Sequence, residues 1–407
     1  MVKSPSMDPE RRGDLEEFRA STRAWLEAHC PSAMRTPARS ADDDVWGGRA
    51  PVFPNEDARV WLERMAAKGW TAPTWPREYG GAGLSRDEAR VLDEEQRRLG
   101  CRMALKSFGV WMLGPVLLEY GTEEQKRTFL PPTARGEIRW CQGYSEPSAG
   151  SDLASLQTRA VLDGDSYVVD GQKVWTSHAD KADWMFCLVR TDAAAPKHEG
   201  ISFLLIDMRS PGVSARPIRL ISGASPFCEA FFDGVRVPAS QLVGTLNGGW
   251  KVAKALLEHE RALISKMRDA AFGEDEPLES VAKRYLGTDD GVLADALLRD
   301  RIAQAGMDSL CNSLTLRRSA ETMRAGRPPG HETSMFKLYG TELNKRRFEL
   351  LVEIEGYRGV GAEGSDVSAE ELASTRAWLR SRANSIEGGS SEIQLNIIAR
   401  RVLGLPE

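Results

Sequence analysis

The feature that most constrains the fold of this chain is a strand-rich stretch that begins near Trp140 and ends near Val243. β-branched and aromatic residues cluster there in short runs separated by turn residues, which is typical of strands. The clearest runs are Tyr167–Val169, Trp184–Val189, Ile201–Ile206 and Ala230–Phe232. Asp170 and Gly171, between two apolar runs, predict a hairpin turn. The stretch as a whole predicts a β domain.

Helical patterns occupy the chain before this stretch. Apolar residues recur at helical spacing from Leu15 to about Gly136. Ser85 and Glu88 have the spacing of a capping box, which predicts a helix through Leu99. Residues 71–83 contain prolines and glycines that no helix can accommodate, so we expect a long ordered loop there.

Helical patterns return after the strand-rich stretch. The expected helices span Trp250–Met267, Ala294–Arg324, Thr333–Leu351 and Ser391–Leu403. A chain of 407 residues is also too long for one core of ordinary size. The pattern therefore predicts three domains, with a helical one over residues 1–139, a β one over 140–245 and a helical one over 246–407.

The overall composition is that of a globular protein. With 41% hydrophobic residues, 28% charged residues and a net charge of -5, it gives no reason to expect nucleic acid or an anionic membrane as a partner. The six cysteines form no C-x-x-C pair and have no histidine cluster nearby, which argues against a zinc site or a disulfide framework. The opening residues lack the apolar core of a signal peptide, and no stretch approaches the length of an apolar membrane span, so we expect neither. We therefore expect a cytoplasmic protein without a metal site.

Six segments resemble landmarks of one enzyme family, the acyl-CoA dehydrogenases, and they follow in the family's order along nearly the whole chain. They are Thr74–Gly81, Tyr120–Lys126, Ser145–Asp152, Gly171–Ser177, Phe231–Pro238 and Gly389–Gln394. The resemblance implies an α+β fold with a helical N-terminal domain, a β-barrel-like middle domain and a C-terminal four-helix bundle.

The same resemblance implies a chemistry. Family members dehydrogenate an acyl-CoA thioester between its α and β carbons: a carboxylate removes the α-proton, and the β-hydrogen leaves as hydride to N5 of FAD. Electrons then pass to an electron-transferring flavoprotein. For this chain the resemblance implies a role in lipid metabolism such as fatty acid β-oxidation, and assembly into a homo- or hetero-oligomer, either a dimer or a tetramer.

The segment from Gln142 to Asp152 offers what a flavin ring needs, namely polar donors and backbone that a ring can approach closely. By resemblance, the residues that contact FAD are Gln142, Tyr144, Ser145, Gly150, Ser151, Trp175, Thr176, Ser177, Ser390 and Glu392. Ser151 would also lie toward the acyl-CoA. The alternative is structural: the segment could be a turn between strands, Trp175 a core aromatic residue and Ser390 a solvated helix cap.

Two carboxylates compete for the role of base. Abstraction of an α-proton needs a carboxylate in an apolar site. Glu260 falls within the apolar stripe of the helix that is expected to start near Gly249, and it resembles the base of some family members. Arg261 would then order the active site or hold substrate. The structural alternative is that Glu260 forms a buried ion pair with a neighbouring helix. The rival base is Glu387, near the position that other family members use.

The chain departs from the family where the FAD pyrophosphate and adenine would bind. The corresponding segments, Lys283–Gly287 and Glu353–Tyr357, lack the family's usual pattern, and the second carries two acidic residues. Either the adenine-side contacts are altered or a different partner chain completes the FAD site. Three functions therefore stay open: a dehydrogenase, a non-catalytic or half-catalytic subunit, and a flavin oxidase or monooxygenase.

Overall fold

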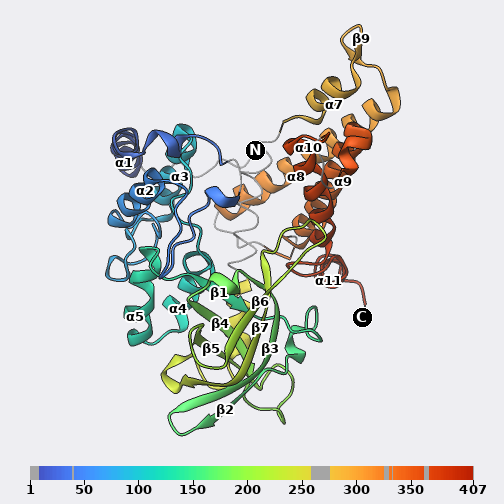
Figure 1. Ribbon diagram of the computed structural model, residues 1–407. Coiled ribbons are helices and arrows are strands. Elements are labelled where there is room, and N and C mark those ends of the chain that lie inside the picture. Colours follow the sequence, from blue (N-terminus) through green and yellow to red (C-terminus); the bar gives the residue numbers. More distant parts are fainter. Residues whose placement is uncertain are drawn as a thin grey trace. The chain divides into compact units, whose positions relative to one another are not determined.

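A computed structural model describes residues 9–38, 41–257, 276–324, 330–331, 333–361 and 366–406 (Figure 1). The chain divides into two units. The first comprises Met1–Ile218 and Pro226–Glu260, and the second comprises Arg219–Ser225 and Arg261–Glu407.

The first unit begins with helices, as the sequence predicts. They are α1 (Pro9–His29), α2 (Glu56–Ala67), α3 (Arg86–Leu99), α4 (Gly114–Tyr120) and α5 (Glu123–Ala134). The predicted capping box at the start of α3 is confirmed, because the Ser85 hydroxyl accepts from the Glu88 amide while the Glu88 carboxylate accepts from the Ser85 amide. Thr122 and Gln125 cap α5 in the same reciprocal way.

The strand-rich stretch forms one eight-stranded sheet. Its strands are β1 (Trp140–Gly143), β2 (Arg159–Asp163), β3 (Ser166–Ser177), β4 (Trp184–Arg190), β5 (Ile201–Asp207), β6 (Val213–Ile218), β7 (Phe227–Pro238) and β8 (Leu242–Val243). The order is β6-β7-β3-β2-β4-β5-β8, with β1 paired to β4. The end strands β6 and β8 are not paired to each other in this sheet, so the described part of the chain contains no closed barrel.

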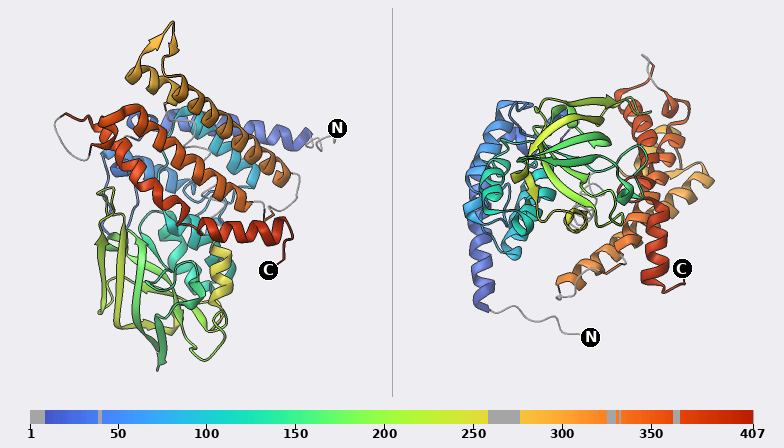
Figure 2. Two further views of the ribbon diagram at one scale, coloured as in Figure 1. Left: turned by 90° about the vertical axis from the view of Figure 1, so that its right-hand side faces the viewer. Right: turned by 90° about the horizontal axis from the view of Figure 1, so that it is seen from below.

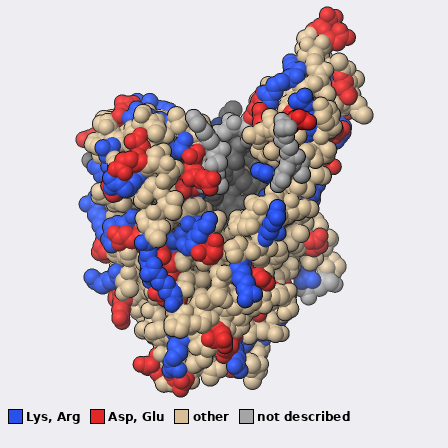
Figure 3. Space-filling model, viewed as in Figure 1, with Lys and Arg blue, Asp and Glu red and all other residues tan. Residues whose placement is uncertain are grey.

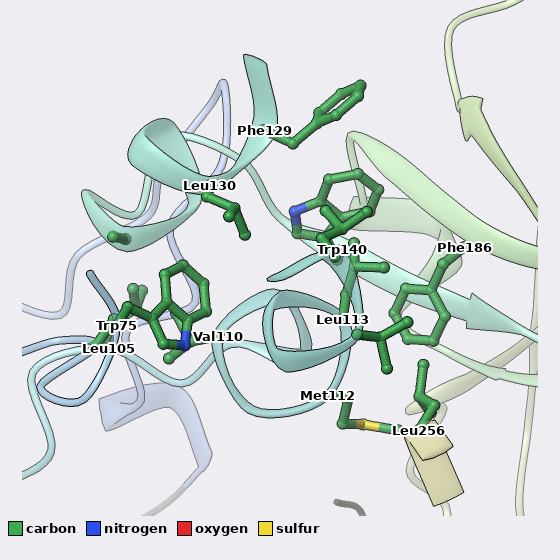
Figure 4. Close-up of a cluster of buried hydrophobic side chains, with 14 of the residues drawn as sticks. Trp75, Leu105, Val110, Met112, Leu113, Phe129, Leu130, Trp140, Phe186 and Leu256 are labelled. Atoms are coloured by element: carbon green, nitrogen blue, oxygen red, sulfur yellow. The ribbon is translucent and has the colours of Figure 1, made fainter. Parts of the chain in front are cut away.

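Strands β4 and β5 are buried on both faces, which explains why their sequences read as continuous apolar runs instead of alternating ones. Phe186 and Phe203 face a core shared with the helices of the first unit. Their neighbours Cys187 and Leu204 face a second core, between these strands and β3 and β7. Figure 4 shows Phe186 beside Met112, Leu113 and other side chains of the first core.

The predicted hairpin at Asp170 and Gly171 is wrong. Strand β3 runs through both residues, and the turn to β2 lies instead at Gly164 and Asp165. Gly171 marks an irregularity in the pairing with β7 and has φ +149°, and a Cβ atom there would meet Thr158 at 2.7 Å. A glycine at this point thus permits a close approach of two chain segments within the sheet rather than a turn.

A π-helical turn over Gly109–Leu113 leads into α4. A Cβ atom on Gly109 would collide with the Trp140 indole, and one on Gly114 with the Trp75 indole. These two glycines let the turn pack closely between two large aromatic rings in the first core (Figure 4).

The second unit contains α7 (Leu278–Leu286), α8 (Ala296–Arg324), α9 (Thr333–Glu355), α10 (Ala369–Ser381) and α11 (Ser391–Ile397). Helix α9 packs against each of the other four, and Figure 2 shows the long helices of this unit side by side. A small hairpin joins β9 (Thr288–Asp289) to β10 (Val292–Leu293). The sequence predicted α8, α9 and α11, with slightly different ends, but not α7, α10 or this hairpin.

Basic and acidic side chains are interspersed over the face that Figure 3 shows. Among the helices of the described residues, none is both long enough and apolar enough to cross a membrane.

Candidate flavin and acyl-CoA site

The segment after β1 forms a tight turn. The amide of Glu146 donates to the Ala149 carbonyl at 3.1 Å, and the amide of Ala149 donates to the Glu146 carbonyl at 3.0 Å. Ser148 does not adopt a positive φ, so its side chain costs no backbone strain. At Gly150, no atom lies within 4 Å of a Cβ position, and this side of the turn is open.

A buried ion pair fastens this turn to β3. The Lys173 ammonium, with none of its side chain exposed, donates to the Glu146 carboxylate at 2.7 Å and to the Tyr144 carbonyl at 3.1 Å. The carboxylate also accepts from the amides of Gln157, at 2.6 Å, and Thr158, at 2.9 Å. Burial would raise the pKa of Glu146, but the Lys173 charge and these hydrogen bonds together lower it.

The turn and β3 are also joined through the main chain. The Val174 amide donates to the Ser145 carbonyl at 2.9 Å. The structure therefore brings the predicted contacts Tyr144 and Ser145 next to the predicted contacts Trp175 and Thr176, which lie some thirty positions later in the chain.

Trp175 occupies an unusual position. It lies at an irregularity in the β3–β7 pairing, has φ 60°, and is 56% exposed. Its ring meets Phe227 edge to face, with 6.1 Å between centroids. Large residues rarely adopt positive φ, and such strain concentrates at functional sites. The alternative that Trp175 is a core aromatic residue is therefore wrong.

Thr176 and Ser177 end β3. The Thr176 hydroxyl is buried and has no hydrogen-bond partner within the part of the chain that the structure describes. Ser177 is half-buried. A flat heterocycle needs polar partners, a flat apolar neighbour and room for close approach. Ser177 fits the first need, Trp175 the second and Gly150 the third.

Three further titratable side chains lie here that were not identified from the sequence, namely Glu146, Lys173 and His178. Glu146 and Lys173 lie inside two of the landmark segments, and Lys173 shares the inward face of β3 with Tyr167 and Val169. That period of two could have revealed a buried lysine in need of a partner. His178 follows the site with φ 54°, and burial, with the Arg139 and Lys181 charges, lowers its pKa to about 4.

The predicted C-terminal contacts lie in the second unit. The Ser390 side chain caps α11 by accepting from the Ile393 amide at 3.4 Å. Glu392 lies in the first turn, where hydrogen bonds from its own amide and from Ser390 lower its pKa. Ser390 is thus a helix cap, which was the structural alternative. Its contact with flavin stays a prediction.

The two candidate bases differ in what the structure describes. Glu387 is exposed, with its carboxylate 2.6 Å from the Arg380 guanidinium and 2.6 Å from the Asn384 amide nitrogen. Glu260 and Arg261 lie outside the described residues. The helix that leads toward them is described over residues 249–257, and there Ala253 and Leu256 are fully buried.

Comparison with known proteins supports the resemblance. Family models match three successive regions: the acyl-CoA dehydrogenase N-terminal domain over residues 13–137, the middle domain over 141–235 and the C-terminal domain over 247–403. The chain is 38% identical over 396 residues to acyl-CoA dehydrogenase IpdE1 of Mycobacterium tuberculosis, covering 97% of this chain and 98% of that protein.

Solved structures agree. A protein described as the Tcur3481-Tcur3483 steroid ACAD superposes with a TM-score of 0.75 at 32% identity, covering 100% of both chains. The ChsE4-ChsE5 complex from M. tuberculosis superposes with a TM-score of 0.73 at 30% identity, again covering 100% of both chains. The expected fold class is confirmed, and the chain belongs to the acyl-CoA dehydrogenase family of oxidoreductases.

Proposed function

We propose that this chain catalyses FAD-dependent α,β-dehydrogenation of an acyl-CoA thioester, with Glu260 as the base and an electron-transferring flavoprotein as electron acceptor. One observation carries the proposal: Trp175 is strained and exposed directly after Val174, whose amide joins β3 to Ser145 of the turn, in a family whose members are FAD flavoproteins. A ligand that covered the ring would offset the cost of exposing it to water.

On this proposal the chain holds the flavin ring through the turn after β1 and the end of β3. Gln142, Tyr144, Ser145 and Ser177 supply polar groups, and Trp175 supplies a flat surface. Gly150 and Ser151 border the open side, where Ser151 would face the acyl-CoA. Bound FAD supplies the hydride acceptor. The roles of Thr176, Ser390 and Glu392 remain predictions from the family resemblance.

Glu260 takes the proton from the carbon next to the thioester carbonyl. Its sequence position, four after Leu256 and seven after Ala253, predicts the same helical face as these buried residues. An apolar setting raises the proton affinity of a carboxylate, which suits a base. Glu387 lacks such a setting, because it is exposed and ion-paired to Arg380. Arg261 would bind substrate or position Glu260.

We further propose a bulky, ring-bearing acyl group rather than an ordinary fatty acyl chain. The support is the relative described as a steroid ACAD, which matches this chain over its whole length.

A second candidate is a subunit that completes the flavin site of a partner chain. The ChsE4-ChsE5 complex favours it, and so do the weak pyrophosphate and adenine segments. Helix α8 carries an exposed apolar stripe of Met307, Leu310 and Leu314, which suits an oligomer interface. Whether the assembly is a homo- or hetero-oligomer, the domain boundaries and the cytoplasmic location all remain predictions.

The test is anaerobic reduction of the bound flavin by a series of acyl-CoA esters that includes ring-bearing ones. With native protein we expect a ring-bearing ester to bleach the flavin absorbance. Glu260→Gln should slow bleaching by roughly a hundredfold or more, the range for loss of a general base. The matched variant Glu387→Gln should bleach normally.

Each other outcome has a meaning. Equal loss in both variants, or loss only in Glu387→Gln, would refute Glu260 as base. A colourless protein that gains flavin only with a partner chain would support the subunit candidate. Oxygen consumption with peroxide release during turnover would indicate an oxidase.

A further inference from the structure

An arginine without a counter-ion lies close to the end of β3. Arg139 directly precedes β1, and its side-chain Nε atom is buried without a hydrogen-bond partner in the part of the chain that the structure describes. The carboxylates of Asp180 and Asp183 act on its guanidinium through their charge but form no hydrogen bond with it. A partly buried cation in this state is costly unless another group pairs with it.

Both of these carboxylates are held by other groups. Asp183 is only 7% exposed, and its Oδ2 atom accepts from the backbone amides of Arg49, at 2.9 Å, and Arg139, at 2.8 Å. The Oδ1 atom of Asp180 accepts from the Cys228 sulfur at 3.3 Å. The guanidinium of Arg139 therefore keeps N–H donors available for a further acceptor.

Aromatic rings surround this guanidinium. Its central carbon lies 5.1 Å from the centroid of the Trp46 ring, over the ring face. The Trp46 ring also meets the rings of Phe108 and His178, with 5.3 and 5.0 Å between centroids. Arg139, Trp46, Phe108 and His178, which we call the Arg139 cluster, are each only half-buried, so a ligand can reach them.

His178 connects the Arg139 cluster to the candidate flavin site. It directly follows Ser177, the predicted flavin contact at the end of β3, and its φ is 54°. Its backbone is held in place, because its amide donates to the Pro226 carbonyl at 2.9 Å. Burial, and then the charges of Arg139 and Lys181, lower the pKa of His178 to about 4. The imidazole is therefore neutral at neutral pH and offers one N–H donor.

The chemistry of the Arg139 cluster selects a class of ligand. A guanidinium has only donors, and it binds carboxylate and carbonyl oxygens well. The rings of Trp46 and Phe108 offer apolar surface to a cyclic hydrocarbon. A hydrocarbon ring that carries an acceptor oxygen satisfies both needs at once.

Taking the ring-bearing acyl-CoA of the proposed function as substrate, we propose that Arg139 and His178 are specificity-determining residues that bind an oxygen carried by its ring. The oxygen belongs to a ketone or a carboxylate, and Trp46 and Phe108 pack against the ring. The guanidinium and the neutral imidazole each donate a hydrogen bond to the oxygen. The Arg139 cluster thus acts on the affinity for substrate and takes no part in the bond changes at the α and β carbons.

An acyl ring without an oxygen would leave the guanidinium without its acceptor. Hydrogen bonds from a charged donor correspond to roughly a 10- to 100-fold difference in affinity. A site that is built around such a bond discriminates strongly against an analogue that lacks the oxygen. The discrimination should appear in the half-saturating concentration, because the thioester chemistry is the same for both substrates.

The test is anaerobic flavin bleaching of the holoprotein by three esters: cyclohexylpropanoyl-CoA, the same ester with a ketone on the ring, and the same ester with a carboxylate on the ring. We expect at least one oxygen-bearing ester to half-saturate at roughly 10- to 100-fold lower concentration than the plain ester, with similar limiting rates. Which of the two does so identifies the oxygen. Arg139→Met should abolish this preference and leave the half-saturating concentration of the plain ester unchanged.

Two further variants are compared with Arg139→Met. Arg159→Met, at an arginine in the same unit whose side chain is 66% exposed and paired with Asp170, should keep the full preference. His178→Asn should reduce the preference in part, because asparagine tolerates positive φ but does not place a donor where the imidazole does. If Arg139→Met does not fold, the native protein and His178→Asn decide the question.

Several results would overturn the proposal. Equal half-saturation of the native protein by all three esters would do so, and so would a preference that persists in Arg139→Met. Equal weakening of all three esters by Arg139→Met would assign Arg139 to the CoA moiety or to folding instead. If no ester bleaches the flavin, the proposed dehydrogenase function fails, and calorimetric binding of the same three esters then tests the Arg139 cluster separately.

Discussion

Replacement of Lys173 by methionine would leave the Glu146 carboxylate buried without its cation. Lys173 has no exposed side-chain surface, and Glu146 has only 5%. Methionine keeps most of the apolar volume of the lysine stem, so the main change is the loss of the charge and of its donated hydrogen bonds. The substitution therefore measures what the ion pair contributes to the turn that carries Tyr144 and Ser145.

The size of the expected loss of stability depends on the hydrogen bonds that Glu146 keeps in the variant. Removal of one partner from a buried pair costs about 3–5 kcal/mol, because the remaining charge is poorly solvated. The amides of Gln157 and Thr158 still donate to the carboxylate, at 2.6 and 2.9 Å, and compensate in part. We therefore expect Lys173→Met to lower the free energy of unfolding by about 3 kcal/mol, at the lower end of that range.

Urea unfolding, followed by tryptophan fluorescence at neutral pH, measures this loss. The matched control is Arg236→Met on the exposed pair of Arg236 and Asp163, whose side chains are 57% and 66% exposed. An exposed pair contributes about 0–1 kcal/mol, so the control should change the midpoint little. Equal effects of the two substitutions would refute the reasoning.

The pH dependence gives a second check with a definite sign. In the native protein the pKa of Glu146 is lowered, so its stabilising contribution is present above the unfolded pKa and is lost as the pH falls through the folded pKa. Without Lys173, burial dominates and raises that pKa, and the buried charge then destabilises the fold only at higher pH. The stability difference between native and Lys173→Met protein should shrink on acidification, and a constant difference would contradict the charge argument.

Three further results are expected. Trp175→Ala should weaken flavin binding by roughly thirtyfold, which is about 2 kcal/mol, because the flavin would no longer cover the exposed indole surface. Flavin fluorescence measures the affinity, and Leu162→Ala, at a side chain 54% exposed in the same sheet, is the control. Unchanged affinity in Trp175→Ala would exclude a contact with flavin. Glu95→Gln should lower the free energy of unfolding in urea by about 2 kcal/mol, because hydrogen bonds from Arg23 and two other arginines hold the pKa of this buried carboxyl at about 2. The stability that the Glu95 carboxylate contributes should persist at neutral pH and be lost as the pH falls toward 2. A stability loss in the variant that is unchanged at low pH would contradict this explanation. Gly114→Ala should lower thermal stability by about 2 kcal/mol through overlap with the buried indole beside it, and an unchanged midpoint would show that the turn can shift.

Much of this protein was determined by local sequence. The capping box at Ser85, the helical period of α8 and α9 and the apolar runs of β4 and β5 specify their elements, because caps and periodicity act within a few residues. Ordered landmark segments were sufficient to indicate the family, because a family signature depends on residue identity and order rather than on packing.

Other features were decided only by the tertiary structure. Asp170 and Gly171 have the composition of a turn, but pairing on both sides of β3 keeps the strand continuous through them. Trp175 could be assigned to a core or to a ligand from sequence alone, and only its strain and exposure distinguish the two. Both outcomes depend on which distant segments lie alongside the residue.

The same reason applies most clearly to the buried ion pair that the fold assembles. Lys173 reaches Glu146 across 27 positions. The pair has no fixed sequence spacing, because the distance between partners is set by how strands and helices pack and not by the chain that joins them. The sequence by itself thus determined the elements and the family, and packing decided which charges became partners.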